Sequence, residues 1–141
     1  QGSYTVPEDL LTAIQAEFWA GCCDDAGAAG TIGRVFSEKG YLCDPHTAAG
    51  WAVAEDYVAA TGDTRPMVVL STASPYKFPA AVLGALGAPL TGDEFAQMAA
   101  LEALTGVRMP ENLRGLDRKP ELHTGVIPKE AMPDFVRKLT F

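Results

Sequence analysis

Two clusters of polar side chains in this sequence lie where an apolar run gives way to the start of a helix. The first, Asp44-Pro45-His46-Thr47, follows the short run Tyr41–Cys43, and the second, Ser71-Thr72-Ala73-Ser74-Pro75, follows Met67–Leu70. In each cluster a capping side chain directly precedes a proline, whose missing N–H has no partner in the first turn of a helix anyway. Either cluster could be a simple helix cap, or the two together could line one ligand site.

The apolar runs predict that the two clusters meet at one edge of a small sheet. Tyr41–Cys43 and Met67–Leu70 are candidate strands, and the connection between them is long enough for a helix and a right-handed crossover. Ligands of open α/β sheets bind in the crevice at the carboxyl ends of the strands. Two short strands cannot complete the buried parallel sheet that Met67–Leu70 favours. The sequence therefore predicts an α/β fold in which short parallel strands form an incomplete sheet packed with several helices.

Helix signals cover most of the remaining chain. Apolar residues at helical spacing, together with capping residues, prolines and glycines, predict helices over 6–20, 26–39, 46–60, 75–86, from Gly92 to Gly106, and over 129–138. We divide the chain into an α/β portion, residues 1–107, and a proline-rich tail, residues 108–141, which we expect to pack on it.

Composition narrows the classes of function. The net charge is −7, and an acidic chain lacks the basic face that binds the phosphates of nucleic acid. No apolar stretch approaches the roughly 18 residues of a membrane span, and no signal peptide opens the chain. Three cysteines, two of them adjacent, do not make a disulfide framework. We therefore expect a cytoplasmic protein with neither a nucleic-acid nor a membrane partner.

No nucleophile and general base stand at a recognisable spacing. Gly-x-Ser-x-Gly, the Walker A pattern and His-Glu-x-x-His are all absent. Gly27–Gly33 matches a glycine-rich phosphate loop only loosely, because it follows a predicted helix rather than a strand. Cys22–Asp25 contains residue types that ligate metals, but adjacent ligands bind one ion poorly. We assign no catalytic residue and no metal ligand to this chain.

At the two clusters the sequence resembles bacterial threonine synthase, a family of fold-type II pyridoxal-phosphate enzymes. The family has an acid followed by Pro-His-Thr/Ala-Ala, where this chain reads Asp44-Pro45-His46-Thr47-Ala48. Further along, the family has an apolar strand ending in Thr-Ala-His-Pro-Ala-Lys-Phe. This chain reads Thr72-Ala73-Ser74-Pro75-Tyr76-Lys77-Phe78 there, and departs from the family at Ser74 and Tyr76. The stretch Met109–Leu116 also looks like the family.

The resemblance implies that the chain is the C-terminal part of a Rossmann-like catalytic domain. The parent enzyme would convert O-phospho-L-homoserine and water to L-threonine and phosphate, in threonine biosynthesis. The cofactor-linked lysine and the loop that binds the cofactor's phosphate lie in the family's N-terminal part, which this sequence lacks. We therefore expect the chain alone to be inactive and to bind no cofactor.

The resemblance also assigns site residues. By match to the family motif, Thr72 would meet the pyridine nitrogen of pyridoxal 5'-phosphate, with Ser71 as the alternative. Asp44 and His46 would line the same cleft near the edge of the cofactor ring. Lys77 is either a structural residue or part of the phosphate environment of the substrate.

Partners follow from the same resemblance. The small-molecule substrate and the N-terminal portion of the enzyme are the expected partners, and an unfinished sheet edge predicts self-association as well. Two other interpretations stay open. The parent could be another fold-type II enzyme, such as a dehydratase or another replacement enzyme, or the chain could be a scaffold without enzymatic activity that binds a protein partner.

Overall fold

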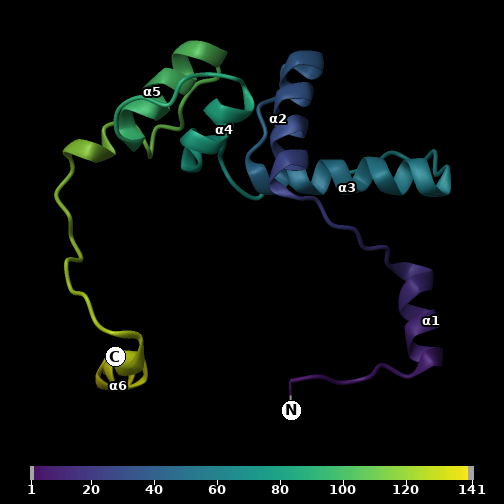
Figure 1. The fold of residues 1–141 in the computed structure, drawn as a ribbon. Coiled ribbons are helices and arrows are strands. Elements are labelled where there is room, and N and C mark those ends of the chain that lie inside the picture. Colours follow the sequence, from purple (N-terminus) through teal and green to yellow (C-terminus); the bar gives the residue numbers. More distant parts are fainter. Residues whose placement is uncertain (1, 140–141) are drawn as a thin grey trace.

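The computed structural model describes residues 2–139, which fold into helices joined by irregular segments (Figure 1). Short 3-10 turns adjoin some of these helices, and we label them η. In chain order the elements are α1 Glu8–Glu17, α2 Asp25–Lys39, α3 Pro45–Thr61, η1 Pro75–Lys77, α4 Pro79–Ala85, α5 Glu94–Thr105, η2 Leu116–Arg118, η3 Lys129–Ala131 and α6 Met132–Lys138.

The helices predicted over 26–39, over 46–60 and from Gly92 to Gly106 are confirmed, because their start and stop signals act locally. The helix predicted over 6–20 is shorter, and the one predicted over 129–138 begins as the 3-10 turn η3. Asp44 caps α3 by accepting the backbone N–H of His46 at 2.9 Å, and Pro45 is the first helical residue. Gly62 ends that helix in the left-handed conformation, with a φ of 69° that an L side chain would adopt only under strain. The helix predicted over 75–86 is interrupted at Phe78, which separates η1 from α4.

The predicted α/β fold is wrong for the part of the chain that the structure describes, since residues 2–139 contain helices and no strand. Tyr41–Cys43 and Met67–Leu70, expected to be parallel strands of an incomplete sheet, are irregular segments. A strand exists only when its backbone bonds a neighbouring strand, and a β-branched run cannot supply that neighbour. Met67, Val68 and Leu70 are consequently exposed rather than buried in a sheet.

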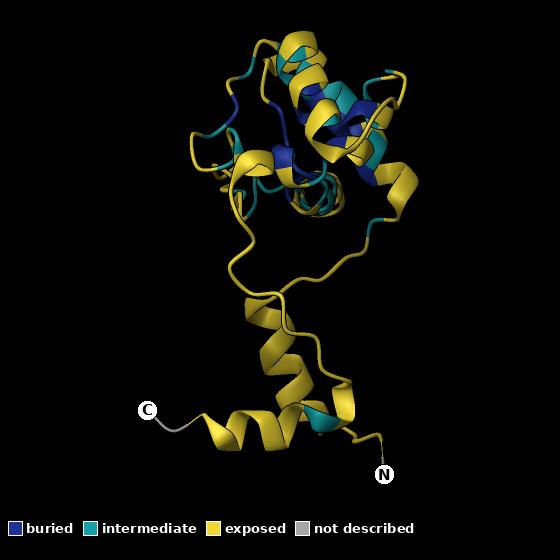
Figure 2. Cartoon of the chain, turned by 90° about the vertical axis from the view of Figure 1, so that its left-hand side faces the viewer, coloured by how far each residue is buried: buried dark blue, intermediate teal, exposed yellow. Residues whose placement is uncertain are grey.

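The core lies where four helices meet. α2 packs on α3 and α4, and α4 packs on α5. Figure 2 shows the buried residues gathered in this body. Its largest fully buried apolar side chains come from α2, the segment before α3, η1, α4 and α5, namely Ile32, Val35, Cys43, Tyr76, Val82, Leu83 and Leu101. The Tyr76 hydroxyl donates a hydrogen bond to the carbonyl oxygen of Val107, which ties η1 to the segment after α5.

Both ends of the chain extend away from the body as arms (Figures 1 and 2). α1 and α6 contain no buried residue. The start of the tail stays with the body: Met109 is buried, and the Arg114 guanidinium lies 2.8 Å from a carboxylate oxygen of Glu102 on α5. The division of the chain at residues 107 and 108 remains a prediction.

Two leucines of α5 test where the core lies. Leu101 is fully buried and Leu104 is half exposed. Leu101→Ala leaves a cavity and is expected to lower the free energy of unfolding by about 2–5 kcal/mol. Leu104→Ala, with the same change of helix propensity, should cost about 0.5 kcal/mol or less. Urea denaturation of the two variants measures the difference, and equal losses would contradict this core.

Candidate functional site

The carboxylate of Asp44 organises the first polar cluster. Its side chain is fully buried at the start of α3. One oxygen accepts the backbone N–H groups of His46 at 2.9 Å and Thr47 at 3.3 Å, and the other accepts the Thr47 hydroxyl. Asp44 therefore does more than cap the helix, since it also fixes the rotamer of Thr47.

His46 stands at the exposed edge of this cluster. Its Nδ1 lies 3.3 Å from Asp44 Oδ1, and about two-thirds of its side chain is exposed. The ring also lies 5.1 Å from the ring of Phe78, centroid to centroid. In the neutral imidazole, a carboxylate facing Nδ1 favours the proton on that nitrogen. The lone pair of Nε2 is then available to a ligand.

Burial and hydrogen bonding act on Asp44 in opposite directions. Burial raises the pKa of its carboxyl group, and the hydrogen bonds from Thr47 and His46 outweigh that effect. The pKa of Asp44 consequently lies below its ordinary value, so the group is an anion at neutral pH. A buried anion next to an imidazole can hold that ring in one orientation.

The second cluster comes to the first through its earliest residue. The Oγ atoms of Thr47 and Ser71 lie 3.4 Å apart, within reach of a weak hydrogen bond. Because Thr47 gives its proton to Asp44, Ser71 is the donor of this pair. Ser74 accepts the backbone N–H of Tyr76 at 3.3 Å and is the cap of η1. The two clusters therefore meet, although no sheet edge holds them.

The other two predicted site residues, Thr72 and Lys77, lie at the surface. Thr72, next to Ser71, and Lys77 in η1 are both exposed. Thr47 and Phe78 are members of this site to which sequence reasoning gave no role. Both stand in the quoted motifs, but only the fold shows that Thr47 bridges the clusters and that Phe78 lies against His46.

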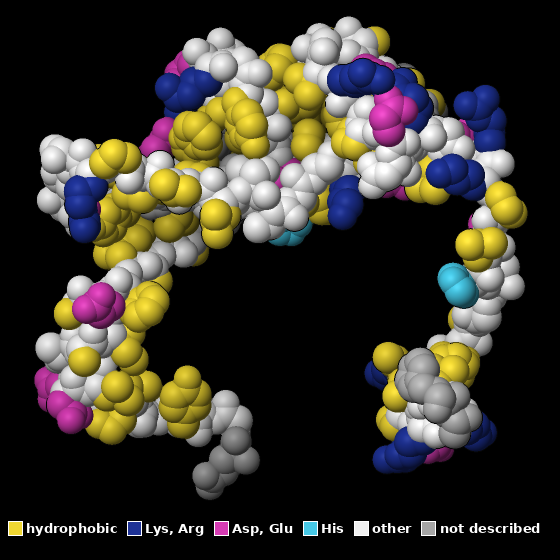
Figure 3. Space-filling model, turned by 180° about the vertical axis from the view of Figure 1, so that it is seen from behind, with side chains coloured by type: hydrophobic (Ala, Val, Ile, Leu, Met, Phe, Trp, Pro, Cys, Tyr) yellow, Lys and Arg dark blue, Asp and Glu magenta, His cyan; other side chains and the backbone are white. Residues whose placement is uncertain are grey.

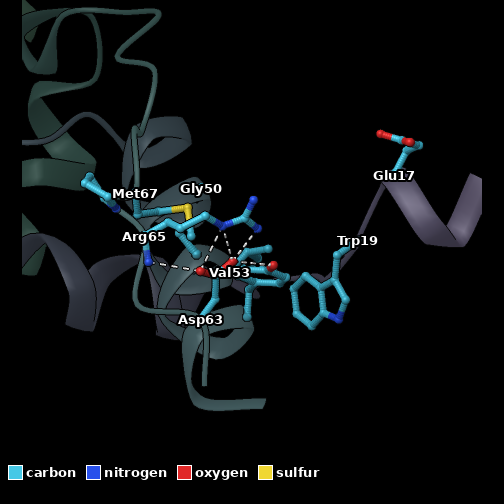
Figure 4. A pocket seen from close by; sticks show the side chains of 10 residues that line it. Glu17, Trp19, Gly50, Val53, Asp63, Arg65 and Met67 are labelled. Atoms are coloured by element: carbon cyan, nitrogen blue, oxygen red, sulfur yellow. Dashed lines mark hydrogen bonds and ion pairs between the residues drawn. The ribbon is translucent and has the colours of Figure 1, made fainter. Parts of the chain in front are cut away.

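A cavity of about 480 Å³ lies elsewhere, along α3 (Figure 4). Tyr57 donates its hydroxyl proton to Asp63 at 2.9 Å, and Arg65 donates from Nε to the same carboxylate at 3.0 Å. These bonds hold the pKa of Asp63 well below its ordinary value. Trp19 packs edge-on against Tyr57, with ring centroids 5.6 Å apart. None of the predicted site residues lines this cavity.

Residues 2–139 contain neither a metal-binding cluster nor a membrane-spanning helix. Within residues 2–139, no group of three or more His, Cys, Asp and Glu side chains stands close enough to hold a metal ion. Among the helices that the structure describes, none is both long and apolar enough to cross a membrane.

Sequence comparisons point to one family. A family model described as "Threonine synthase, C-terminal" matches residues 47–136. The chain is 35% identical to threonine synthase of Corynebacterium glutamicum over 100 residues, which are 68% of this chain and 20% of that protein. It is 30% identical to human threonine synthase-like 1 over 86 residues, which are 61% of this chain and 11% of that protein.

A solved structure agrees with these matches. PLP-bound threonine synthase from Brucella melitensis superimposes with a TM-score of 0.55 and 36% sequence identity. The superposition covers 73% of this chain and 24% of that one. The chain therefore spans about a quarter or less of the length of these relatives.

Substituting Asp44 tests its hold on His46. Asp44→Ser keeps an N-cap oxygen but removes the carboxylate, so the neutral His46 ring should lose its preference for the Nδ1–H tautomer. Nitrogen NMR above the ordinary imidazole pKa of about 6.5 distinguishes the tautomers. Asp93→Ser, the same change at the N-cap of α5, is the matched control. If the ring-nitrogen signals of His46 in the unsubstituted chain already match those of the tail residue His123, the assignment of the Nδ1–H tautomer is contradicted.

The lowered pKa of Asp44 gives a second expectation. A carboxyl group with a lower pKa in the folded chain stabilises the fold at neutral pH, and this contribution is lost as the pH falls below its ordinary value of 3.8. The difference in Tm between the unsubstituted chain and Asp44→Asn should therefore shrink in acid. Thr47→Val removes the hydroxyl donor and should weaken this pH dependence. A difference in Tm that stays constant from neutral to acidic pH would refute the expectation.

Proposed function

The chain belongs to the threonine synthase C-terminal family, and on that premise we propose that it is the C-terminal part of a threonine synthase. The parent enzyme would convert O-phospho-L-homoserine and water to L-threonine and phosphate, a step of amino-acid biosynthesis. The observation that carries the proposal is the family match over residues 47–136. It includes Thr47 and Ser71, the residues through which the two polar clusters touch.

We propose that the parent enzyme uses pyridoxal 5'-phosphate, as the PLP-bound relative from Brucella melitensis supports. The cofactor supplies the electron sink for chemistry at the amino-acid carbons. Thr72 suits the pyridine nitrogen, because its neutral hydroxyl is exposed beside Ser71 and open to a ligand. Ser71 is the alternative, with a hydroxyl that also reaches Thr47.

The remaining residues of the site bind and orient in this proposal. The buried Asp44 carboxylate orients His46, whose largely exposed ring would border the cofactor ring. Lys77 offers an exposed ammonium group that suits the phosphate of the substrate. The cofactor-linked lysine and the phosphate-binding loop would lie on the remainder of the enzyme, so the chain by itself would be inactive and would bind no cofactor.

The remainder of the enzyme is then the essential partner. It would bring the cofactor-linked lysine and the phosphate-binding loop to the clusters at Asp44 and Ser71. A cytoplasmic location accords with three cysteines, two of them adjacent, that do not make a disulfide framework.

The assay of choice is phosphate release from O-phospho-L-homoserine in the presence of pyridoxal 5'-phosphate. The purified 141-residue chain should release none, whereas the full-length natural polypeptide that contains it should turn over. In that polypeptide, Thr72→Val removes the hydroxyl at nearly constant volume and should lower kcat/KM roughly 10-fold to 100-fold, about 1.4–2.7 kcal/mol. Ser74→Ala, which changes a helix cap in the same cluster, is the control and should keep most of the activity.

Robust turnover by the 141-residue chain would refute its inactivity. A full-length polypeptide that deaminates hydroxy amino acids but leaves O-phospho-L-homoserine intact would favour a fold-type II dehydratase. Equal activity of Thr72→Val and the unsubstituted enzyme would remove the role given to Thr72.

A further inference from the structure

An apolar surface borders the second polar cluster and has no cover among the described residues. It consists of Trp51 and Val58 on α3 together with the segment Met67–Leu70, and we call it the α3 face. Beneath the segment lies a cavity of about 440 Å³ lined mainly by apolar side chains: Trp51, Ala54, Val58, Ala59, Met67 and Val69, with the carboxylate of Glu55. Figure 3, which views the molecule from behind, shows hydrophobic side chains gathered on the left-hand side of the body, where α3 lies.

The segment Met67–Leu70 is apolar on both of its sides. Val69 is turned toward α3, since a Cβ added to Gly50 would meet its Cγ1 at 3.8 Å. Val68 and Leu70 are about four-fifths and three-quarters exposed. Side chains that face water in a folded protein are normally polar, and contiguous exposed apolar side chains usually mark an interaction site. The outer side of this segment therefore has the composition of a buried surface.

The rim of the α3 face is polar and already ordered. Glu55 accepts the indole N–H of Trp51 at 2.8 Å and a guanidinium N–H of Arg34 at 3.1 Å. Tyr41 stacks on Trp51, with ring centroids 6.5 Å apart. Tyr, Trp and Arg are enriched in protein interfaces, where an apolar centre is bordered by polar residues. This arrangement is that of an interface whose partner is a protein surface.

We infer that the α3 face is the docking surface for the remainder of the threonine synthase polypeptide, an inference that rests on the proposed function. The chain covers 24% of the Brucella melitensis enzyme and 20% of the Corynebacterium glutamicum enzyme, so most of either enzyme has no counterpart here. Ser71 and Thr72 continue directly from Leu70. A polypeptide seated on Val68 and Leu70 lies beside the proposed cofactor site, which a second copy of this chain would not complete.

The test is co-expression of the tagged chain with Corynebacterium glutamicum threonine synthase from which the matched region has been removed. The unsubstituted chain should capture this truncated enzyme, and Leu70→Asp should lose most of the capture. Leu90→Asp introduces the same charge at an exposed leucine between α4 and α5 and should capture normally. Circular dichroism should show both variants folded, because neither leucine is buried.

A single-chain hybrid gives a second measurement that does not need two soluble pieces. Residues 47–136 replace the matched region of the Corynebacterium glutamicum enzyme, and Val68→Cys is labelled with a maleimide. In the isolated chain Cys22→Ser and Cys23→Ser remove the two accessible native thiols. The introduced thiol should react there and lose its reactivity in the hybrid. Equal labelling in both would overturn the inference, as would equal capture by Leu70→Asp and the unsubstituted chain.

Two further outcomes separate the competing explanations. A dimer of the isolated chain that Leu70→Asp converts to a monomer, with no capture of the truncated enzyme, would overturn the inference in favour of a second copy. A captured complex without turnover of O-phospho-L-homoserine would leave the docking surface intact and contradict only the proposed reaction.

Discussion

The buried carboxylate of Asp44 is the interaction on which the proposed site depends. Asp44 ends the irregular segment after α2. Its side chain caps α3 and accepts a hydrogen bond from the hydroxyl of Thr47. Thr47 in turn touches Ser71, so the two polar clusters are joined through a single anion and its donors. A buried charge is tolerated only where several hydrogen bonds compensate its desolvation, and Asp44 has both backbone and side-chain donors. The geometry of the site is thereby linked to the stability of the helix.

Only some of the apolar residues are buried in the core, and many others remain exposed. α2, α3, α4 and α5 bury a small core, whereas α1, α6 and the segment Met67–Leu70 keep apolar side chains at the surface. Contiguous exposed apolar surface usually marks an interaction site. The same body therefore positions Asp44 and Ser71 and also presents the α3 face. The proposed site and the α3 face are neighbours, because Ser71 follows Leu70 directly. A shared location for binding site and interface is expected if a partner completes the site.

The cavity beside Trp19 differs from the polar clusters in what forms it. Its lining comes from α3, from the loop around Asp63 and Arg65 that follows α3 directly, and from the N-terminal arm, which is distant from both in sequence. No sequence motif predicts this cavity, since neither Tyr57 nor Asp63 belongs to a recognisable pattern. The clusters at Asp44 and Ser71, in contrast, could be found from the sequence because capping residues and prolines occur there at fixed spacing. Family resemblance then attached roles to Thr72 and His46 that local patterns alone would not supply.

The sequence by itself determined the helices and the likeness to the threonine synthase family. Caps such as Asp44 and stops such as Gly62 act through hydrogen bonds within a few residues, so a local pattern suffices to place them. It did not determine whether Met67–Leu70 forms a strand, because a strand depends on a distant backbone to pair with. The tertiary structure decided that point, leaving the segment unpaired within residues 2–139. It also decided that Thr47 meets Ser71 and that His46 packs on Phe78, since contacts across the fold depend on how α3 and η1 are placed.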